Sequence, residues 1–191
     1  MPPTHPRRRA DAQRSFDSIL DGALDALASD PDASMAEIAR RAGVVRATIY
    51  VHFPTRETLI EAVTHRAISD VTAAIEAADP AHGEPADALR RVVTAAWRRL
   101  GRFHTLVEVN SRLPQADLHA MHRPVLAVLQ HLVERGQHDG AFRADVPATW
   151  HLSMLLALVH AASGELSAGR IPAPQVQKAL LASVRGAIRA T

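Results

Sequence analysis

Apolar side chains recur at helical spacing through most of the chain. Over residues 10–28 they return every three or four positions, which is the period of a helix with one buried face. A long stretch after Thr55 shows the same period and ends near residues 78–80, where the sequence reads Ala-Asp-Pro. Five more such segments follow, separated by proline and glycine, and Pro124 is expected to start the main part of the third: 85–100, 102–113, 117–138, 147–168 and 174–190. The pattern predicts an all-α protein.

A short helix is predicted over residues 35–42. Ser34 and Glu37 form the Ser-x-x-Glu pattern of a capping box, in which the serine accepts a hydrogen bond from the third amide of the helix. The glutamate of such a box reaches back to the amide of the serine. Gly43 then ends the helix, because glycine tolerates the left-handed conformation on which helices commonly stop.

The next stretch, residues 45–53, alternates strictly between apolar and polar side chains. Alternation is typical of a half-buried strand. However, no other segment alternates well enough to pair with it, and a lone strand is not stable. We therefore predict a helix that buries Val45, Ile49 and Phe53 at a spacing of four. The outward arc of this helix then holds Arg46, Ala47, Tyr50 and Val51, with Thr48 and His52 on its flank.

Two short helices joined by a tight turn with glycine predict a helix-turn-helix motif. The second helix carries side chains suited to DNA, because a guanidinium can bond guanine through two hydrogen bonds and methyl groups can contact thymine methyls. Hydroxyl and imidazole groups can bind phosphates. Arg56 lies in the first turn of the next helix, where a phosphate would be favoured. The candidate DNA-binding residues are Ser34, Arg46, Ala47, Thr48, Tyr50, Val51, His52, Thr55 and Arg56.

Composition and charge narrow the class of protein. The chain has 191 residues and no cysteine, which excludes disulfides and thiolate metal sites. No signal peptide is expected, because no apolar segment follows the basic start, and the longest apolar run, residues 154–162, is far shorter than the ~20 residues of a membrane span. We expect a soluble, cytoplasmic protein. Residues 38–56 contain four arginines and no acid, which favours a polyanionic partner, whereas the basic tip over residues 1–9 is expected to be disordered.

The segment from Phe16 to Ala67 resembles the tetracycline-repressor (TetR) family of transcriptional regulators. The resemblance centres on IARRAGVVRATIYVHFPTRETLIEAV, which is similar to the family pattern AGVSxGTLYxHFxSKEAL. The positions that match as they stand are Ala42, Gly43, Val44, Thr48, Tyr50, His52, Phe53 and Glu57. The resemblance implies a three-helix DNA-binding domain over residues 10–66. It also implies a larger helical domain for effector binding and dimerisation over residues 67–191.

Three of the departures from the family pattern bear on DNA binding. Val45 stands where the family has a serine that caps the recognition helix and can touch a phosphate. Ala47 replaces a frequent glycine and is still small enough for a close approach to DNA. Arg56 occupies the place of a lysine that usually contacts a phosphate.

The last two predicted helices favour a dimer. Residues 153–162 are apolar around the whole helix, so the helix must be covered on two sides. The final helix carries one apolar stripe, and the two helices from each of two chains would form an intermolecular four-helix bundle. The expected interface residues are Leu155, Val159, Val176, Leu180, Val184 and Ile188.

An effector pocket is expected to be mostly apolar with a few polar groups. The candidate lining residues, for which plain core packing is the alternative, are Trp97, Phe103, His104, Trp150 and Met154. Three arginines at helical spacing, Arg91, Arg98 and Arg102, form either a solvated face or a surface toward an anionic effector. His119 and His122 could share a metal ion, but no third ligand accompanies them, so no metal site is predicted.

The expected function is that of a DNA-binding transcriptional regulator, a repressor released from a palindromic operator by a small-molecule effector. We expect a homodimer without catalytic residues or cofactors. Two alternatives remain at this point. One is a helical enzyme with a histidine-liganded metal, and the other is a ligand sensor that acts through a protein partner, which the loss of the serine at position 45 would favour.

Overall fold

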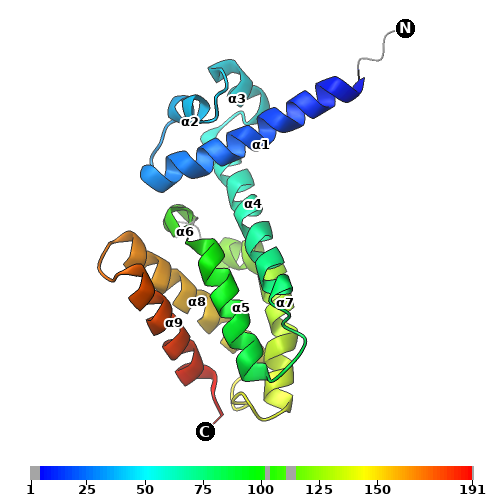
Figure 1. Ribbon diagram of the computed structural model, residues 1–191, viewed down its shortest axis with the longest axis vertical. Helices are drawn as coiled ribbons and strands as arrows, with labels where there is room; N and C mark the ends of the chain where they lie inside the picture. The colour runs from blue at the N-terminus through cyan, green and yellow to red at the C-terminus, as the bar shows by residue number, and fades with distance from the viewer. Residues whose placement is uncertain (1–4, 102–103, 111–114, 191) are drawn as a thin grey trace. The chain divides into compact units, whose positions relative to one another are not determined.

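A computed structural model describes residues 5–101, 104–110 and 115–190 of the chain (Figure 1). These residues form nine helices, and the predicted all-α fold is confirmed. The helices are α1 (His5–Ser29), α2 (Met35–Arg41), α3 (Arg46–His52), α4 (Arg56–Ala77), α5 (Pro85–Leu100), α6 (His104–Asn110), α7 (Gln115–His138), α8 (Ala148–Ser167) and α9 (Ala173–Ile188). One antiparallel bridge, between Phe142 and Arg189, adds an extended contact.

Two helix boundaries differ from the prediction. Helix α1 begins at His5, so the expectation of a disordered tip over residues 1–9 is wrong from residue 5 onward, and residues 1–4 lie outside the described part. Helix α7 contains Pro124 instead of starting there. Of the helix expected over 102–113, residues 104–110 form α6, and the others lie outside the described residues.

The chain divides into two compact units, Met1–Arg66 and Ala67–Thr191. The sequence analysis placed its domain boundary between the same two residues. Helix α4 begins in the first unit and ends in the second.

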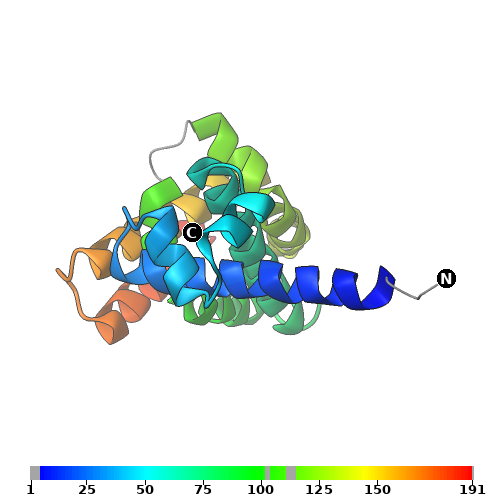
Figure 2. The same cartoon turned by 90° about the horizontal axis from the view of Figure 1, so that it is seen from above.

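In the first unit, α2 and α3 lie against α1, and the N-terminal turns of α1 project beyond them (Figure 1 and Figure 2). Each helix contributes side chains that are removed from solvent, as the helical spacing predicts. The fully buried members are Ile19, Ala23, Ala26, Leu27, Ile38, Ile49, Leu59 and Val63. This shared core fixes α2, the turn and α3 on α1 and on the first turns of α4.

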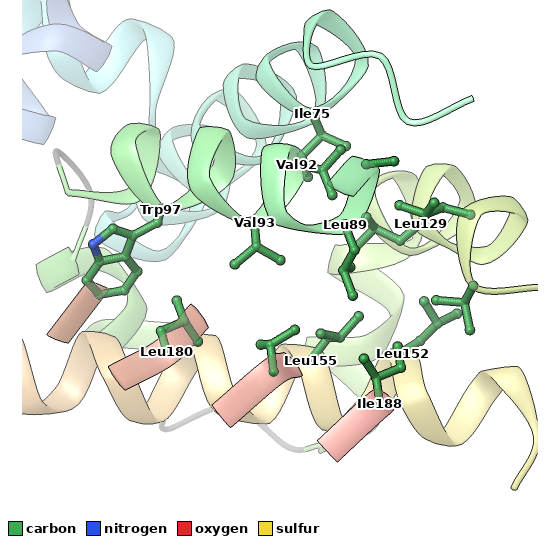
Figure 3. Close-up of a cluster of buried hydrophobic side chains, with 14 of the residues drawn as sticks. Ile75, Leu89, Val92, Val93, Trp97, Leu129, Leu152, Leu155, Leu180 and Ile188 are labelled. Carbon is green, nitrogen blue, oxygen red and sulfur yellow. The ribbon is translucent and has the colours of Figure 1, made fainter. Parts of the chain in front are cut away.

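In the second unit, one apolar core joins the end of α4 to α5, α7, α8 and α9. Figure 3 shows side chains from these helices meeting in one cluster, with Trp97 at one end. Helix α8 contacts α6, α7 and α9, and α5 contacts α7 and α9. Helix α8 is apolar around its circumference because helices of its own chain cover it on several sides.

Five of the six residues expected at the dimer interface are buried within the single chain. Val176, Leu180, Val184 and Ile188 are at most 3% exposed, and all four belong to the core of the single chain. Leu155 is buried in the same core, and Val159 is half-buried against it. A side chain that is already covered within one chain has little surface left to bury against a second chain.

Part of the surface that α8 and α9 leave exposed consists of small residues. They are Ala157, Ala161, Gly164 and Ala168 at or just after α8, and Ala179, Ala182, Ser183 and Gly186 on α9. A Cβ built on Gly164 or Gly186 meets no heavy atom within 4 Å, so both positions face open space. Figure 1 shows α8 and α9 side by side, and the two helices are in contact.

Candidate nucleic-acid interface

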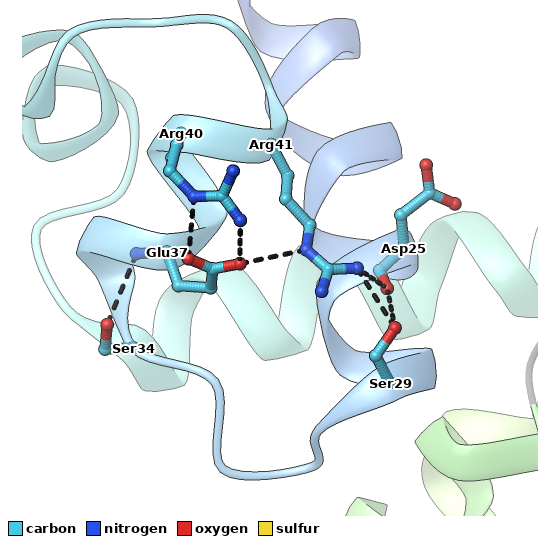
Figure 4. Close-up of polar contacts among 6 residues, drawn as sticks. All are labelled: Asp25, Ser29, Ser34, Glu37, Arg40 and Arg41. Atoms are coloured by element: carbon cyan, nitrogen blue, oxygen red, sulfur yellow. Dashed lines mark hydrogen bonds and ion pairs between the residues drawn. The ribbon is translucent and has the colours of Figure 1, made fainter.

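Helix α2 is capped by Ser34, as predicted (Figure 4). The backbone of Ser34 is extended, with φ −76° and ψ 158°, and its Oγ accepts a hydrogen bond from the Glu37 N–H at 3.2 Å. The second half of the expected capping box is wrong. The Glu37 carboxylate accepts hydrogen bonds from Arg40 at 2.6 and 2.9 Å and from Arg41 at 3.0 Å. Because Arg40 and Arg41 donate to it, the pKa of Glu37 is lowered to about 2 and the carboxylate stays charged at neutral pH.

Arg41 also joins α2 to α1. Its Nη1 donates to the Asp25 carbonyl at 2.7 Å and to the Ser29 hydroxyl at 3.0 Å. On the same side, Gly22 of α1 lies so close to the turn that a Cβ on it would be 2.6 Å from the Cα of Ala42. The sequence analysis missed this role of Gly22. The available signal was a glycine inside a predicted helix, which has a packing reason in many cases.

Residues Arg46–His52 form helix α3, so the helical interpretation of the alternating stretch is confirmed. Ile49 and Phe53 are buried as expected, but Val45 is 70% exposed. Val45 is the N-cap, with φ −74° and ψ 151°, and α3 starts without a side-chain cap. A spacing argument fails for Val45 because an N-cap residue lies outside helical geometry.

The outward arc of α3 is the one predicted. Arg46, Ala47, Tyr50 and Val51 are exposed, while Thr48 and His52 are half-buried on the flank. Phe16 of α1 packs against the inner side, with ring centroids 6.0 Å from His52 and 5.2 Å from Phe53. The Arg46 guanidinium lies over the Tyr50 ring, 5.7 Å from its centroid, so the two longest side chains of the arc are held together.

Arg46 differs from the other three arginines between residues 38 and 56, all of which the structure describes. Arg40 and Arg41 bind Glu37. Arg56 donates from Nη2 to the Pro31 carbonyl at 2.6 Å and from Nε to the Ala33 carbonyl at 3.3 Å, so it supports the loop between α1 and α2. Arg46 bonds neither an acid nor a carbonyl. Its guanidinium is therefore the one of the four that bonds no acid or carbonyl in the described part of the chain.

Thr55 caps α4, as the sequence predicted. Its Oγ1 accepts a hydrogen bond from the Thr58 N–H at 3.2 Å, and the Thr58 Oγ1 accepts one from the Thr55 N–H at 3.3 Å. Thr58 therefore supplies part of the cap that a glutamate provides in a standard capping box.

The candidate effector residues do not form one site. Trp97 is 6% exposed and belongs to the core of the second unit, against which Met154 packs half-buried. Trp150 is 62% exposed, so it does not share the buried surroundings of Trp97. Phe103 and the side chain of His104 lie outside the described residues. Of the three arginines considered for an anionic effector, Arg91 is bound to carbonyls of residues 78, 79 and 82, and Arg102 lies outside the described residues.

His122 of α7 contacts His160 of α8, with ring centroids 5.4 Å apart and the rings edge to face. Burial, together with the neighbouring His122, lowers the pKa of His160 to about 4. The side chain of His119, the other half of the pair considered for a metal, lies outside the described residues. Among the described side chains, no group of three or more histidine or acidic residues could hold a metal ion.

A helix-turn-helix whose second helix exposes an available arginine and two apolar methyl-bearing side chains defines a class of DNA-binding proteins. Residues 19–63 match the family model of bacterial regulatory proteins of the tetR family. The TetR transcription regulatory protein from Mycobacterium vanbaalenii is 30% identical over 82% of this chain and 96% of that chain, with a TM-score of 0.57. The chain belongs to the TetR family and is a DNA-binding transcriptional regulator.

A second relative is the transcriptional repressor LfrR of Mycolicibacterium smegmatis, which is 42% identical over 81 residues. This match spans 42% of the chain and 43% of the repressor, less than half of either protein. The crystal structure of LfrR in complex with proflavine, from Mycobacterium smegmatis, has a TM-score of 0.73 and 28% identity, covering 94% of this chain and 98% of that chain. Regulators of the family bind operator DNA and small-molecule ligands and act as dimers.

The described helices include none with the length and apolar character needed to cross a membrane.

Proposed function

We propose that this chain is a homodimeric repressor that binds a palindromic operator through α3 and leaves it when a small molecule binds the second unit. The observation that carries the proposal is the outward arc of α3, where Arg46 has no acidic partner while the neighbouring arginines are engaged. A seven-residue helix of this kind fits the major groove with its side chains toward base edges.

The residues of the first unit divide into two roles. Arg46 donates to guanine, and the methyl groups of Ala47 and the 80% exposed Val51 contact thymine methyls. Tyr50, Thr48 and His52 bind phosphates beside the same groove. Ser34, Thr55 and Arg56 act as positioning residues, because their side chains already bond the backbone of the first unit. The hydroxyl groups of Ser34 and Thr55 can cap α2 and α4 and still approach a phosphate.

Dimerisation uses the exposed small-residue faces of α8 and α9 in place of the buried stripe expected from the sequence. Small side chains let helices of two chains approach closely, because the distance between packed helices depends on the side chains at the contact. The first units of the two chains, related by a two-fold axis, would then bind the two half-sites of a palindrome.

The effector acts by favouring one arrangement of the dimer. A small molecule that binds better when the spacing of the two first units does not match the operator shifts the population away from DNA. By the same coupling, DNA lowers the affinity for the small molecule. The proflavine in the LfrR structure supports a small-molecule ligand for this fold. We assign no catalytic role to any residue. Family membership does not favour the metalloenzyme or the sensor without DNA binding.

The test measures sequence-specific DNA binding. Duplexes selected by the protein from a random-sequence pool are titrated with wild-type protein, Arg46→Ala and Arg46→Lys, together with single-base variants and a random duplex. Loss of a guanine contact costs about 1–3 kcal/mol, so Arg46→Ala should weaken binding to the selected duplex about 5- to 150-fold and relax the preference at one base pair per half-site.

Arg46→Lys is the matched control because it keeps the charge but loses the planar two-donor geometry. It should retain binding to random duplex and lose the base preference. If wild-type protein selects no sequence from the pool, the proposed function is wrong. If Arg46→Ala weakens selected and random duplexes equally, Arg46 binds phosphate and does not read a base.

A further inference from the structure

A groove with a volume of about 520 Å³ opens in the second unit, between the end of α5 and the region where α8 and α9 connect. Trp97 and Arg98 line it from α5, Leu166 from α8, and Ala173, Pro174 and Gln177 from α9. The sequence analysis placed Trp97 and Arg98 in separate hypotheses, one for an apolar pocket and one for an anionic effector. The structure brings both to the wall of one groove.

The groove is lined by hydrogen-bond donors that bond no other residue in the described part of the chain. Trp97 is 94% buried, since its exposed fraction is 6%, and its Nε1–H has no hydrogen-bond partner among the described residues. Figure 3 shows this nitrogen on the edge of the apolar cluster, turned away from Val93. A donor on a groove wall that bonds no described residue can donate to a ligand acceptor.

The other polar side chains of the groove are also hydrogen-bond donors. Arg98 is exposed and forms no ion pair or hydrogen bond within the described part of the chain, and the side-chain amide of Gln177 likewise has no described partner. None of the lining residues is acidic. The first turn of α9 adds partial positive charge, since α9 starts at Ala173 and its N-cap Pro172 supplies no side-chain cap.

The remaining walls are apolar. Leu166, Ala173 and Pro174 offer hydrocarbon surface, and the Trp97 ring adds an aromatic face. A fully charged polyanion would leave this surface unused, whereas a neutral hydrocarbon would leave the donors unsatisfied. Ligand sites combine a mostly apolar lining with a few placed polar groups in this way.

We infer that the groove binds an amphipathic monocarboxylate. Its carboxylate accepts hydrogen bonds from Trp97 Nε1–H, the Arg98 guanidinium and the Gln177 amide, and its apolar body lies on Leu166 and Pro174. This inference rests on the proposed function only in that such a molecule would serve as the effector.

The chain offers a direct spectroscopic test, because Trp97 and Trp150 are its only tryptophans. The exposed Trp150 is replaced in Trp150→Phe, which leaves Trp97 as the sole emitter. This variant is titrated with octanoate, octanamide and octylamine, which share a chain and differ in the head group. Octanoate should shift the emission of Trp97 saturably. Octanamide should bind at least about tenfold more weakly, as expected for losing a charged hydrogen bond, and octylamine should give no saturable change.

Arg98→Gln and Arg90→Gln, each made in the Trp150→Phe protein, form a matched pair. Both remove an exposed arginine of α5, but Arg90 pairs with Asp87 and does not line the groove. Arg98→Gln should reduce octanoate affinity about tenfold or more and leave octanamide affinity unchanged, whereas Arg90→Gln should alter neither.

Three results would overturn the inference: no saturable change with octanoate, equal affinities for octanoate and octanamide, or equal losses in Arg98→Gln and Arg90→Gln. DNA binding is measured on the same proteins without octanoate. A protein that selects a duplex and ignores octanoate refutes the groove alone. A protein that binds octanoate and selects no duplex refutes the proposed function alone.

Discussion

The four arginines between residues 38 and 56 show how the same side chain takes different roles through its neighbours. Arg41 bonds Glu37, the Asp25 carbonyl and Ser29, and thereby holds α2 on α1. Arg56 holds the preceding loop through two carbonyls. Arg46 lies over Tyr50 and keeps its donors available. A count of positive charges alone would have treated these residues as equivalent contacts to DNA.

Val45→Ser should stabilise the first unit. Val45 and Ser34 are both N-caps with nearly the same backbone angles, −74° and 151° against −76° and 158°, but only Ser34 caps its helix with a side chain. Val45 is 70% exposed, so its replacement loses little packing. A serine Oγ would accept from the Thr48 N–H, which now donates to the Val45 carbonyl at 2.9 Å. We expect a gain of about 0.5–1 kcal/mol in the free energy of unfolding, measured with urea.

Ser34→Ala is the control, since it removes an existing side-chain cap of the same geometry. It should lower the free energy of unfolding by about 1 kcal/mol. Val45→Ala separates loss of the valine from gain of the hydroxyl and should leave stability nearly unchanged. A Val45→Ser protein no more stable than Val45→Ala would show that the α3 terminus is satisfied without a side-chain cap.

At the scale of elements, helix α8 has apolar side chains around its whole circumference because other helices of the chain pack on several of its sides. Its neighbours α6, α7 and α9 cover most of it, so the large apolar side chains meet the chain's own core. Where α8 meets α7, the core contains a polar pair, His122 and His160. Burying histidines at a helix contact makes the stability of that contact depend on pH.

Replacing His160 should reduce the loss of stability in acid. The pKa of His160 is lowered to about 4 from an ordinary value near 6.5, so the unfolded chain binds the proton more readily than the folded one. The contribution of His160 is therefore fully present above about pH 6.5 and declines as the pH falls toward 4. After allowance for its partial exposure, we expect a loss on the order of 1–2 kcal/mol over that window.

Urea unfolding of wild-type protein, His160→Gln and His131→Gln between pH 7.5 and pH 4.5 measures this effect. His131 is 90% exposed at its side chain and serves as the control. The decline should be smaller in His160→Gln and unchanged in His131→Gln. Parallel pH curves for all three proteins would mean that His160 titrates alike in the folded and unfolded states.

At the scale of the whole molecule, the proposed dimer depends on surface that one chain leaves open. Apart from Trp150 near the start of α8, the exposed positions of α8 and α9 carry no large apolar side chain. Close packing of two such faces would bring backbones together, and any added bulk would hold them apart.

Gly164→Leu and Gly186→Leu should weaken the dimer without unfolding the chain. A Cβ at either position meets no atom within 4 Å, and leucine favours the helix over glycine by roughly 0.5–1 kcal/mol. By sedimentation at micromolar concentration, wild-type protein should be dimeric. The variants should have a dimer dissociation constant raised tenfold or more, with unchanged helicity by circular dichroism.

Gln130→Leu places the same side chain on an exposed face of α7 and should leave the dimer intact. A wild-type protein that sediments as a monomer would refute the dimer itself. Glycine variants that dimerise like the wild type would refute this interface and leave the dimer possible through another face.

Local pattern determined much of this protein. The helical spacing of apolar residues predicted the all-α fold, and the Ser34 and Thr55 caps were predictable because a cap involves neighbours three residues apart. The outward arc of α3 followed from its period, since one face of a helix with a buried Ile49 leaves the opposite face exposed. The family followed from an ordered run of residues within this same local segment.

Tertiary structure decided what covers each surface. The apolar stripe of α9 could pack on its own chain or on a second one with the same periodicity, and only the arrangement of α5, α8 and α9 assigns it to the core. The carbonyl partners of Arg56, the close contact at Gly22 and the groove beside Trp97 and Arg98 likewise depend on residues distant in sequence. Periodicity shows which residues share one face of a helix. Which other helix covers that face depends on how the helices pack in the folded chain.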